Sequence, residues 1–473
     1  MPRSFFLCLI FLAGAVAIAI PSKPQVRFLT YEEARPLLQS LGEALPAELK
    51  GQSAEECARV WPAWVKAQDS AVRARLRRGD EDTLINFLLF GASFSKRPRV
   101  TAQELSRSQQ SQTQEAFDSL IDARIDDLIR SLGDQKAAGQ NERLRFLRKL
   151  VIGQGMRPED PAGRAKLREY ILANLLRTLR EQESYSRTIA AARLQGNPGE
   201  EFIGRSKLYR ERGLSLDTTL APNFAIEESL KAMKARGLIR AESVRRVGVI
   251  GPGLDFTDKA AGYDFYPEQT IQPFALIDSL LRLGLAKANE LRITAFDISP
   301  RALAHLAAAR MRAMRGSAYV TQLPRDPQAM WKPDLVRYWE SFGDQIGKPA
   351  APAPAPAGLS ELKLRAVRVT PAFVARVTPV DLNIVYQRMS EPQNFDLIIA
   401  TNILVYYEVF EQSLALANIE SLLREGGFLL SNNALLELPN SKMKSVDYLT
   451  VVYSDRPDDG DHIVWYQRAG TRQ

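Results

Sequence analysis

The feature that most constrains this chain is a short apolar strand followed by a glycine turn, RRVGVIGPGLDF at residues 245–256. The run VGVI is typical of a buried strand, and the turn after it consists of Gly251, Pro252 and Gly253. Glycine adopts the unusual φ of a tight turn and leaves no Cβ between the backbone and a ligand. The stretch therefore predicts the nucleotide-binding edge of an open α/β sheet, although an ordinary tight turn carries the same signal.

Strand and helix patterns alternate from residue 244 onward. Strands are expected at residues 244–250, 291–296, 364–369, 373–380, 395–400 and 428–431. Helices are expected at residues 270–283, 300–314 and 408–424, the last of them broken by Gly426 and Gly427. Two closing β-rich segments, 446–453 and 462–467, predict an antiparallel hairpin. The fold class is therefore α/β: a doubly wound, Rossmann-like sheet with a C-terminal antiparallel hairpin.

The region before this sheet predicts an all-α domain at residues 20–240, whose role its residues do not reveal. Ser53 and Glu56 have the spacing of a capping box. Trp61 and Trp64 share one helix, where such residues more often pack in a core than hold a ligand.

Within the second domain, residues 241–473, the strand and helix alternation is interrupted at residues 316–360. The interruption contains KPAAPAPAPAG, in which alternating Pro and Ala favour an extended backbone. We interpret it as an insertion that carries a Pro/Ala-rich tether.

Residues 1–19 have the form of a signal peptide or signal anchor. Arg3 precedes an apolar run, and Ala17 and Ala19 form an A-x-A cleavage pattern. We expect an exported, periplasmic or membrane-anchored protein, with membrane association through the N-terminus, and a cytoplasmic one if this signal is misread. Cleavage would leave Cys57 as the one cysteine of the mature chain.

Charge and composition exclude several classes of site. The formal net charge of +8 over 473 residues is too modest an excess to require nucleic acid as a partner. Two histidines and two cysteines provide no zinc-ligand set and no obvious Cys–His pair, so no metal site is predicted. His305 and His462 are expected to be structural or surface residues.

Polar residues follow the predicted strands at the edge where the glycine turn lies. Asp297, followed by Ile298, comes after the second strand, where a carboxylate accepts both hydroxyls of a ribose. Asp381 and Leu382 follow the third strand and suit an adenine amine and ring. Asn402 emerges at the end of the fourth strand.

The spacing does not fit a dinucleotide. Asp297 follows Gly253 by 297 − 253 = 44 residues, whereas the dinucleotide fingerprint expects about 20. Asp255 or Phe256 stands near the place of the third glycine, where a carboxylate would oppose a pyrophosphate. S-Adenosylmethionine, which has a ribose and an adenine but no phosphate, fits better.

The segment FDLIIATNILVYY, followed by LLREGGFLLSNNALLE, resembles the catalytic domain of CheR-type chemotaxis methyltransferases, within the class I S-adenosylmethionine-dependent methyltransferases. The resemblance implies that Asn402 and Tyr406 are catalytic. It also implies a cofactor site made by the residues Gly251, Pro252, Gly253, Asp297, Ile298, Asp381, Leu382, Thr401 and Asn402. Asp381 and Leu382 would replace the family's Asn-Leu pair, and Asn383 and Ile384 are the alternative counterparts of that pair.

The sequence departs from this family in ways that leave the acceptor open. Thr401 replaces the family's Arg, and Val249 stands where many methyltransferases have an acidic residue. The helical region does not match the family's receptor-binding domain, so a protein carboxylate is only one candidate acceptor. Alternatively, Asn402 or Asp297 caps a helix and Tyr406 packs under the sheet.

Three functions fit these observations. The first is an active methyltransferase retained with its cofactor in the cytoplasm. The second is an exported protein that keeps the fold as a binding or scaffold module without catalysis. The third is a basic peripheral protein at a membrane surface.

Overall fold

The structure is a computed structural model that describes residues 25–100, 114–195, 213–216, 218–255, 263–432, 434–456 and 459–470. The predicted signal at residues 1–19 and Phe256 lie outside these ranges. Within them, no helix is both long enough and apolar enough to cross a membrane.

Helices dominate the first part of the described chain. They are α1 (Tyr31–Leu41), η1 (Gly42–Ala44), α2 (Ala54–Phe90), α4 (Gln114–Gly133), α5 (Gln135–Gln140), α6 (Glu142–Gly153) and α7 (Pro161–Gln195). The helices of the second part are α9 (Ala221–Ala235), α10 (Gln272–Arg282), α11 (Pro300–Met314), α12 (Pro333–Ser341), η2 (Ala357–Leu359), α13 (Pro371–Val374), η3 (Leu404–Tyr406) and α14 (Val409–Leu422).

Most strands belong to one seven-stranded sheet with the order β11-β12-β10-β9-β2-β3-β7. They are β2 (Arg246–Ile250), β3 (Arg292–Asp297), β7 (Val377–Asp381), β9 (Phe395–Ala400), β10 (Leu423–Ser431), β11 (Met443–Val452) and β12 (Gly460–Arg468). The first five of these are mutually parallel, and β12 runs antiparallel to both of its neighbours. This confirms the predicted fold class, with the strand order reversing between β2 and β9.

Both faces of the sheet are covered by helices, and β9 shows how the sequence achieves this. Leu397 and Ile399 join a core with helices α9, α10 and α11. Ile398 and Ala400 join the core on the opposite face, with α1, α14 and the first half of α2. The alternation of side chains along a strand explains why a continuous apolar run is needed in a sheet buried on both faces.

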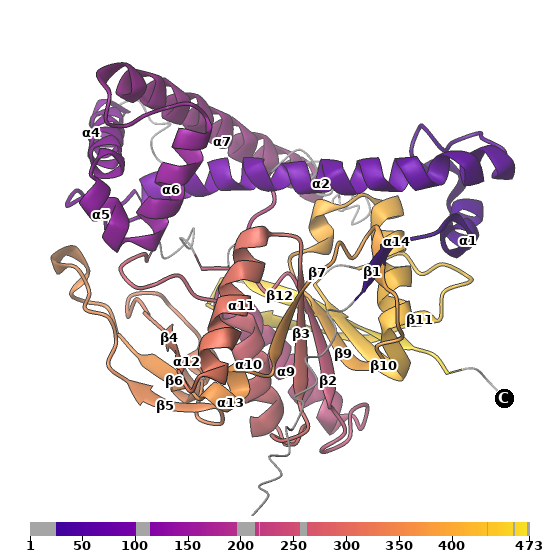
Figure 1. Ribbon diagram of the computed structural model, residues 1–473. Helices are drawn as coiled ribbons and strands as arrows, with labels where there is room; N and C mark the ends of the chain where they lie inside the picture. The colour runs from indigo at the N-terminus through magenta and orange to yellow at the C-terminus, as the bar shows by residue number, and fades with distance from the viewer. Residues whose placement is uncertain are drawn as a thin grey trace, which may run out of the picture.

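Helix α2 connects this sheet to the helical region. Its 37 residues span about 55 Å. Trp61 and Trp64 are buried in the core shared with α14, whereas residues 84–90 pack with α4, α6 and α7 in a third core. The predicted capping box of Ser53 and Glu56 and the predicted core role of both tryptophans are confirmed. Figure 1 shows α2 running across one edge of the sheet, from the α4–α7 group to α1.

Among the described residues, five strands lie outside the seven-stranded sheet and form two smaller sheets. β1 (Val26–Phe28) pairs antiparallel with β8 (Gln387–Met389). The expected strand at 364–369 is β6 (Ala366–Val369), which leaves the main sheet and pairs with β4 (Tyr319–Gln322) and β5 (Gly347–Ala350). The interruption at 316–360 thus contributes β4 and β5 to a three-stranded sheet, and it also contains α12.

The predicted role of Gly426 and Gly427 as helix breakers is wrong. Helix α14 ends at Leu422, and both glycines lie inside β10. Gly426 has φ +72°, and the register between β10 and β9 shifts between Leu423 and Phe428. Glycine suits this position because it adopts the left-handed φ at this irregularity without a clash of a Cβ.

Candidate functional site

The glycine turn at the end of β2 is closed by a side chain of the protein. Gly251 has φ +66° and Gly253 has φ +74°, so both positions require a residue that tolerates the left-handed region. A Cβ at Gly251 would lie 2.1 Å from Cδ1 of Ile403. The bare backbone that the sequence assigns to a ligand is thus in contact with Ile403.

Asp297 lies at the carboxyl end of β3, beside this turn. Its side chain is 7% exposed, and it accepts a hydrogen bond from the Ser299 N–H at 2.8 Å. Burial raises the pKa of Asp297 to about 6, against the opposing effect of hydrogen bonds from the backbone. The N-cap of α11 is Ser299, so the alternative in which Asp297 caps this helix is wrong. A buried carboxylate of this kind is a candidate functional group.

Asp381 lies opposite Asp297 in the register of β3 and β7. It is the more accessible of the two, with 57% of its side chain exposed, and forms an ion pair with Arg73 of α2 at 2.8 Å. Leu382 is buried, and its N–H donates to the Asp297 carbonyl at 3.1 Å. The two carboxylates therefore occupy equivalent places on neighbouring strands.

The alternative counterparts Asn383 and Ile384 are committed to internal contacts. Asn383 is 1% exposed and donates to Asp69 of α2 at 2.8 Å, and Ile384 is buried in the core. Of the two predicted pairs, Asp381 and Leu382 lie nearer to Asp297.

The end of β9 presents one exposed residue. Thr401 is buried and accepts a hydrogen bond from Gln272 at 3.0 Å. Asn402 is exposed and has φ +58°. The N-cap of α14 is Glu408, so the alternative in which Asn402 caps this helix is wrong.

Tyr406 ends η3 and lies at the margin of the core beneath the sheet. Its carbonyl accepts a hydrogen bond from Arg75 of α2 at 3.1 Å. The predicted alternative, packing under the sheet, therefore describes part of its environment.

Helix α2 lies over these strand ends, which the sequence did not predict. Arg73 donates to the Ile298 carbonyl at 3.4 Å as well as to Asp381. With the contact of Arg75 to Tyr406, one helix thus reaches the segments after β3, β7 and β9. In the sequence these arginines belong to a basic cluster, Arg73, Arg75, Arg77 and Arg78, which by itself indicates no more than a solvated surface. The distinguishing signal is Asp69, one helical turn before Arg73, which forms an ion pair with it at 3.1 Å.

Asp255 does not face the turn, which corrects the expectation that it would oppose a pyrophosphate. It is 5% exposed and accepts hydrogen bonds from Tyr266 at 2.8 Å and from Gln269 at 3.1 Å. Arg143 of α6 lies 3.7 Å from the same carboxylate. The spacing and the missing third glycine remain as reasons against a dinucleotide.

Among the described residues, neither histidine forms a hydrogen bond with a predicted site residue. His305 bonds to the hydroxyl of Tyr319 at 2.8 Å, and burial lowers the pKa of His305 to about 4. His462 bonds to Thr450 at 2.9 Å on the C-terminal hairpin. Both have the structural or surface role that the sequence predicts.

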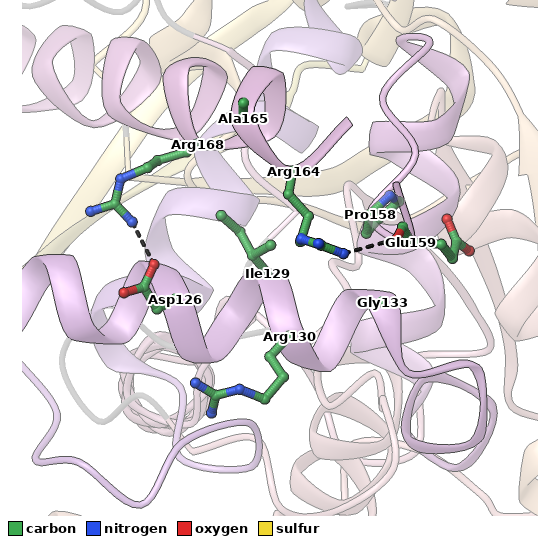
Figure 2. Close-up of a pocket in the computed structure, with 9 residues that line it drawn as sticks. All are labelled: Asp126, Ile129, Arg130, Gly133, Pro158, Glu159, Arg164, Ala165 and Arg168. Atoms are coloured by element: carbon green, nitrogen blue, oxygen red, sulfur yellow. Dashed lines mark hydrogen bonds and ion pairs between the residues drawn. The ribbon is translucent and has the colours of Figure 1, made fainter. Parts of the chain in front are cut away.

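A groove of about 710 Å³ lies elsewhere, between α4 and α7. Figure 2 shows Arg168 turned toward Asp126 and Arg164 turned toward Glu159, while Arg130 points away from both pairs. Arg168 contacts Asp126 at 2.5 Å, and Arg164 donates to the Glu159 carbonyl at 2.8 Å. Because these cations are satisfied within the groove, it offers no clear site for an anion.

No protein-family model matches the chain. No curated protein matches it. Among solved structures it is similar to CalO1, a methyltransferase in calicheamicin biosynthesis in its SAH-bound form, with 12% identity, a TM-score of 0.24, and 87% of this chain and 98% of that chain covered.

Two further solved structures have similarly low identities and TM-scores to this chain. The CurJ carbon methyltransferase has 11% identity and a TM-score of 0.24, with 93% and 99% of the two chains covered. Human N-acetylserotonin methyltransferase in complex with SAM has 9% identity and a TM-score of 0.22, with 90% and 100% covered. TM-scores this low do not establish structural equivalence, so nothing that these proteins bind is transferred to this chain.

Proposed function

We propose that the chain transfers a methyl group from S-adenosylmethionine to an acceptor at the carboxyl edge of its sheet. The observation that supports this most is the buried Asp297, which lies at the end of β3 next to the point where the strand order reverses. Open α/β sheets bind their ligands near this point, and a buried carboxylate with a raised pKa is a candidate functional group there.

The residues present fit such a cofactor if two side chains move. Asp297 would hold the ribose hydroxyls, and Asp381 would accept from the adenine amine. Ile403 would have to leave Gly251, and Arg73 would have to release Asp381. Both side chains are partly exposed, so rotation at the surface is enough to free the space.

When bound, the sulfonium of this cofactor supplies an activated methyl group and a good leaving group. The protein then has to align the acceptor and exclude water, and α2 lies over the strand ends where it could help with both. No histidine contact is available at the described strand ends for a general base. An acceptor that needs no deprotonation, such as a carboxylate, suits this site. A protein carboxylate is also the acceptor of the CheR-type family that the sequence resembles.

Calorimetry with S-adenosylmethionine and its demethylated product, S-adenosylhomocysteine, tests the proposal. The unmodified protein should bind both, and Asp297→Ala should bind neither. Asp396→Ala is the matched control, because Asp396 lies on the opposite edge of the sheet and accepts from the N–H groups of Arg245 and Arg246 at 2.7 and 2.9 Å. Undetectable binding at millimolar ligand, in the unmodified protein and in Arg73→Ala, would reject the enzyme.

That negative result would instead support a binding or scaffold module that keeps the fold. The specific observations in its favour are the contact of Ile403 with Gly251 and the ion pair of Arg73 with Asp381. Both fill space that a cofactor needs, and both would be permanent in a scaffold.

The compartment separates the two functions independently. If the predicted signal at residues 1–19 exports or anchors the chain, the protein is separated from a cofactor made in the cytoplasm, and if that signal is misread, it stays with the cofactor. A reporter that is active only outside the cytoplasm, fused after residue 30, measures this directly. Reporter activity favours the scaffold, and its absence favours the enzyme.

A further inference from the structure

Asn402 has a left-handed backbone conformation that residues other than glycine rarely adopt. Three non-glycine residues of the described chain have positive φ: Glu242 at 54°, Asn394 at 53° and Asn402 at 58°. Glu242 precedes β2 and Asn394 precedes β9, so both lie at the amino edge of the sheet. Among the described residues Asn402 is thus the one strained non-glycine residue that follows a strand at the candidate site. Strain that persists at such a place is a reason to look for a function.

A hydrogen-bonded chain of side chains holds Asn402 in this conformation. The Asn402 N–H donates to Oδ1 of Asn432 at 2.8 Å, and Nδ2 of Asn432 donates in return to Oδ1 of Asn402. Asn432 also donates to Asp461 of β12 at 3.5 Å, and Asp461 accepts from the Tyr453 hydroxyl at 2.6 Å. Because Oδ1 of Asn402 is engaged, its amide N–H groups are turned away from Asn432.

The sheet order relates this amide to the predicted ribose site. Asp297 ends β3 on one side of β2, and β9, which leads to Asn402, lies on the other side. Two strand spacings separate β3 from β9, which is roughly 10 Å. A ligand whose ribose lies at Asp297 and which crosses the glycine turn reaches Asn402 with its other end. For S-adenosylmethionine that end is the amino-acid tail.

We propose that Asn432 and Asp461 are positioning residues that hold Asn402 so that its amide donates to the carboxylate of this tail. The inference rests on the proposed function. It assigns the C-terminal hairpin, through Asp461 and Tyr453, a part in building the cofactor site.

Calorimetry with two probes tests this assignment. S-Adenosylhomocysteine carries the amino-acid tail, and 5′-methylthioadenosine lacks it. The substitution Asn432→Ala should weaken S-adenosylhomocysteine about tenfold, the equivalent of one lost hydrogen bond to a charged group, and leave 5′-methylthioadenosine unchanged. Asn402→Gly should have the same effect while relieving the backbone strain, so it guards against a variant that fails to fold.

Asn394→Gly is the matched control, because Asn394 has the same left-handed conformation at the opposite edge of the sheet, and this variant should leave both affinities unchanged. If Asn432→Ala binds S-adenosylhomocysteine as tightly as the unmodified protein, or loses both probes equally, the positioning role is wrong. If the unmodified protein binds neither probe, the proposed function itself fails, which is a different and recognisable result.

Discussion

Replacing Asp297 with asparagine should stabilise the protein at neutral pH while removing the proposed ribose ligand. Burial raises the pKa of this carboxyl from 3.8 to about 6, a shift worth roughly 3 kcal/mol. The folded state therefore holds the proton more tightly than the unfolded state does. The favourable contribution of the protonated Asp297 carboxyl to the free energy of unfolding is fully present below pH 3.8, and it is lost as the pH rises through about 6.

Asparagine has no charge to bury, and its Oδ1 can still accept the Ser299 N–H that Asp297 accepts at 2.8 Å. The free energy of unfolding of Asp297→Asn should exceed that of the unmodified protein by roughly 3 kcal/mol near pH 8. The difference should fall to about zero near pH 4, because both side chains are then neutral. Urea unfolding of the two proteins across this pH range measures the difference in the free energy of unfolding. The contributions of the other titrating groups are the same in both proteins and cancel in this difference.

Asp381→Asn is the control, because Asp381 lies opposite Asp297 in the register but is 57% exposed and paired with Arg73. It should show no comparable stabilisation near pH 8. The reasoning fails if Asp297→Asn is the less stable protein near pH 8, or if the difference does not change with pH.

Three further predictions concern the contacts of Gly251, Arg143 and Arg73. Gly251→Ala should lower the free energy of unfolding by about 2–4 kcal/mol, because alanine is strained at this φ and its Cβ clashes with Ile403. In a double-mutant cycle followed by urea unfolding, adding Ile403→Ala should recover the part that is due to the clash. Simple additivity of the two substitutions would contradict this. Arg143→Met should cost about 3–5 kcal/mol because it leaves a buried carboxylate 3.7 Å away without its cation, and a loss below about 1 kcal/mol in urea unfolding would contradict this. Arg73→Ala should tighten S-adenosylmethionine binding in calorimetry, at a cost in stability because it also removes the ion pair with the buried Asp69; weaker binding would show that Arg73 supports the cofactor instead.

The sequence predicted those parts of the fold that depend on local pattern. The bounds of β9 and α11 agree with the predicted ranges 395–400 and 300–314, because an apolar run and a proline start are signals carried by neighbouring residues. The position of Asp297 at the end of β3 follows from the same strand pattern.

Long-range pairing was not predictable in this way. The pairing of Val26–Phe28 with Gln387–Met389 joins segments that no local period relates. The same holds for Arg73, whose contacts with Ile298 and Asp381 depend on where α2 crosses the sheet. Gly426 was misread because a glycine pair after a helix has the same local signature whether it ends the helix or forms a bulge.

A crystal structure of the protein grown with S-adenosylhomocysteine tests most directly whether the strand ends form one adenosine site. We expect the ligand to lie with its ribose on Asp297 and its tail toward Asn402, with Ile403 moved away from Gly251. A ligand bound elsewhere, with Ile403 still packed on that glycine and Arg73 still on Asp381, would contradict the proposed site and leave only the fold.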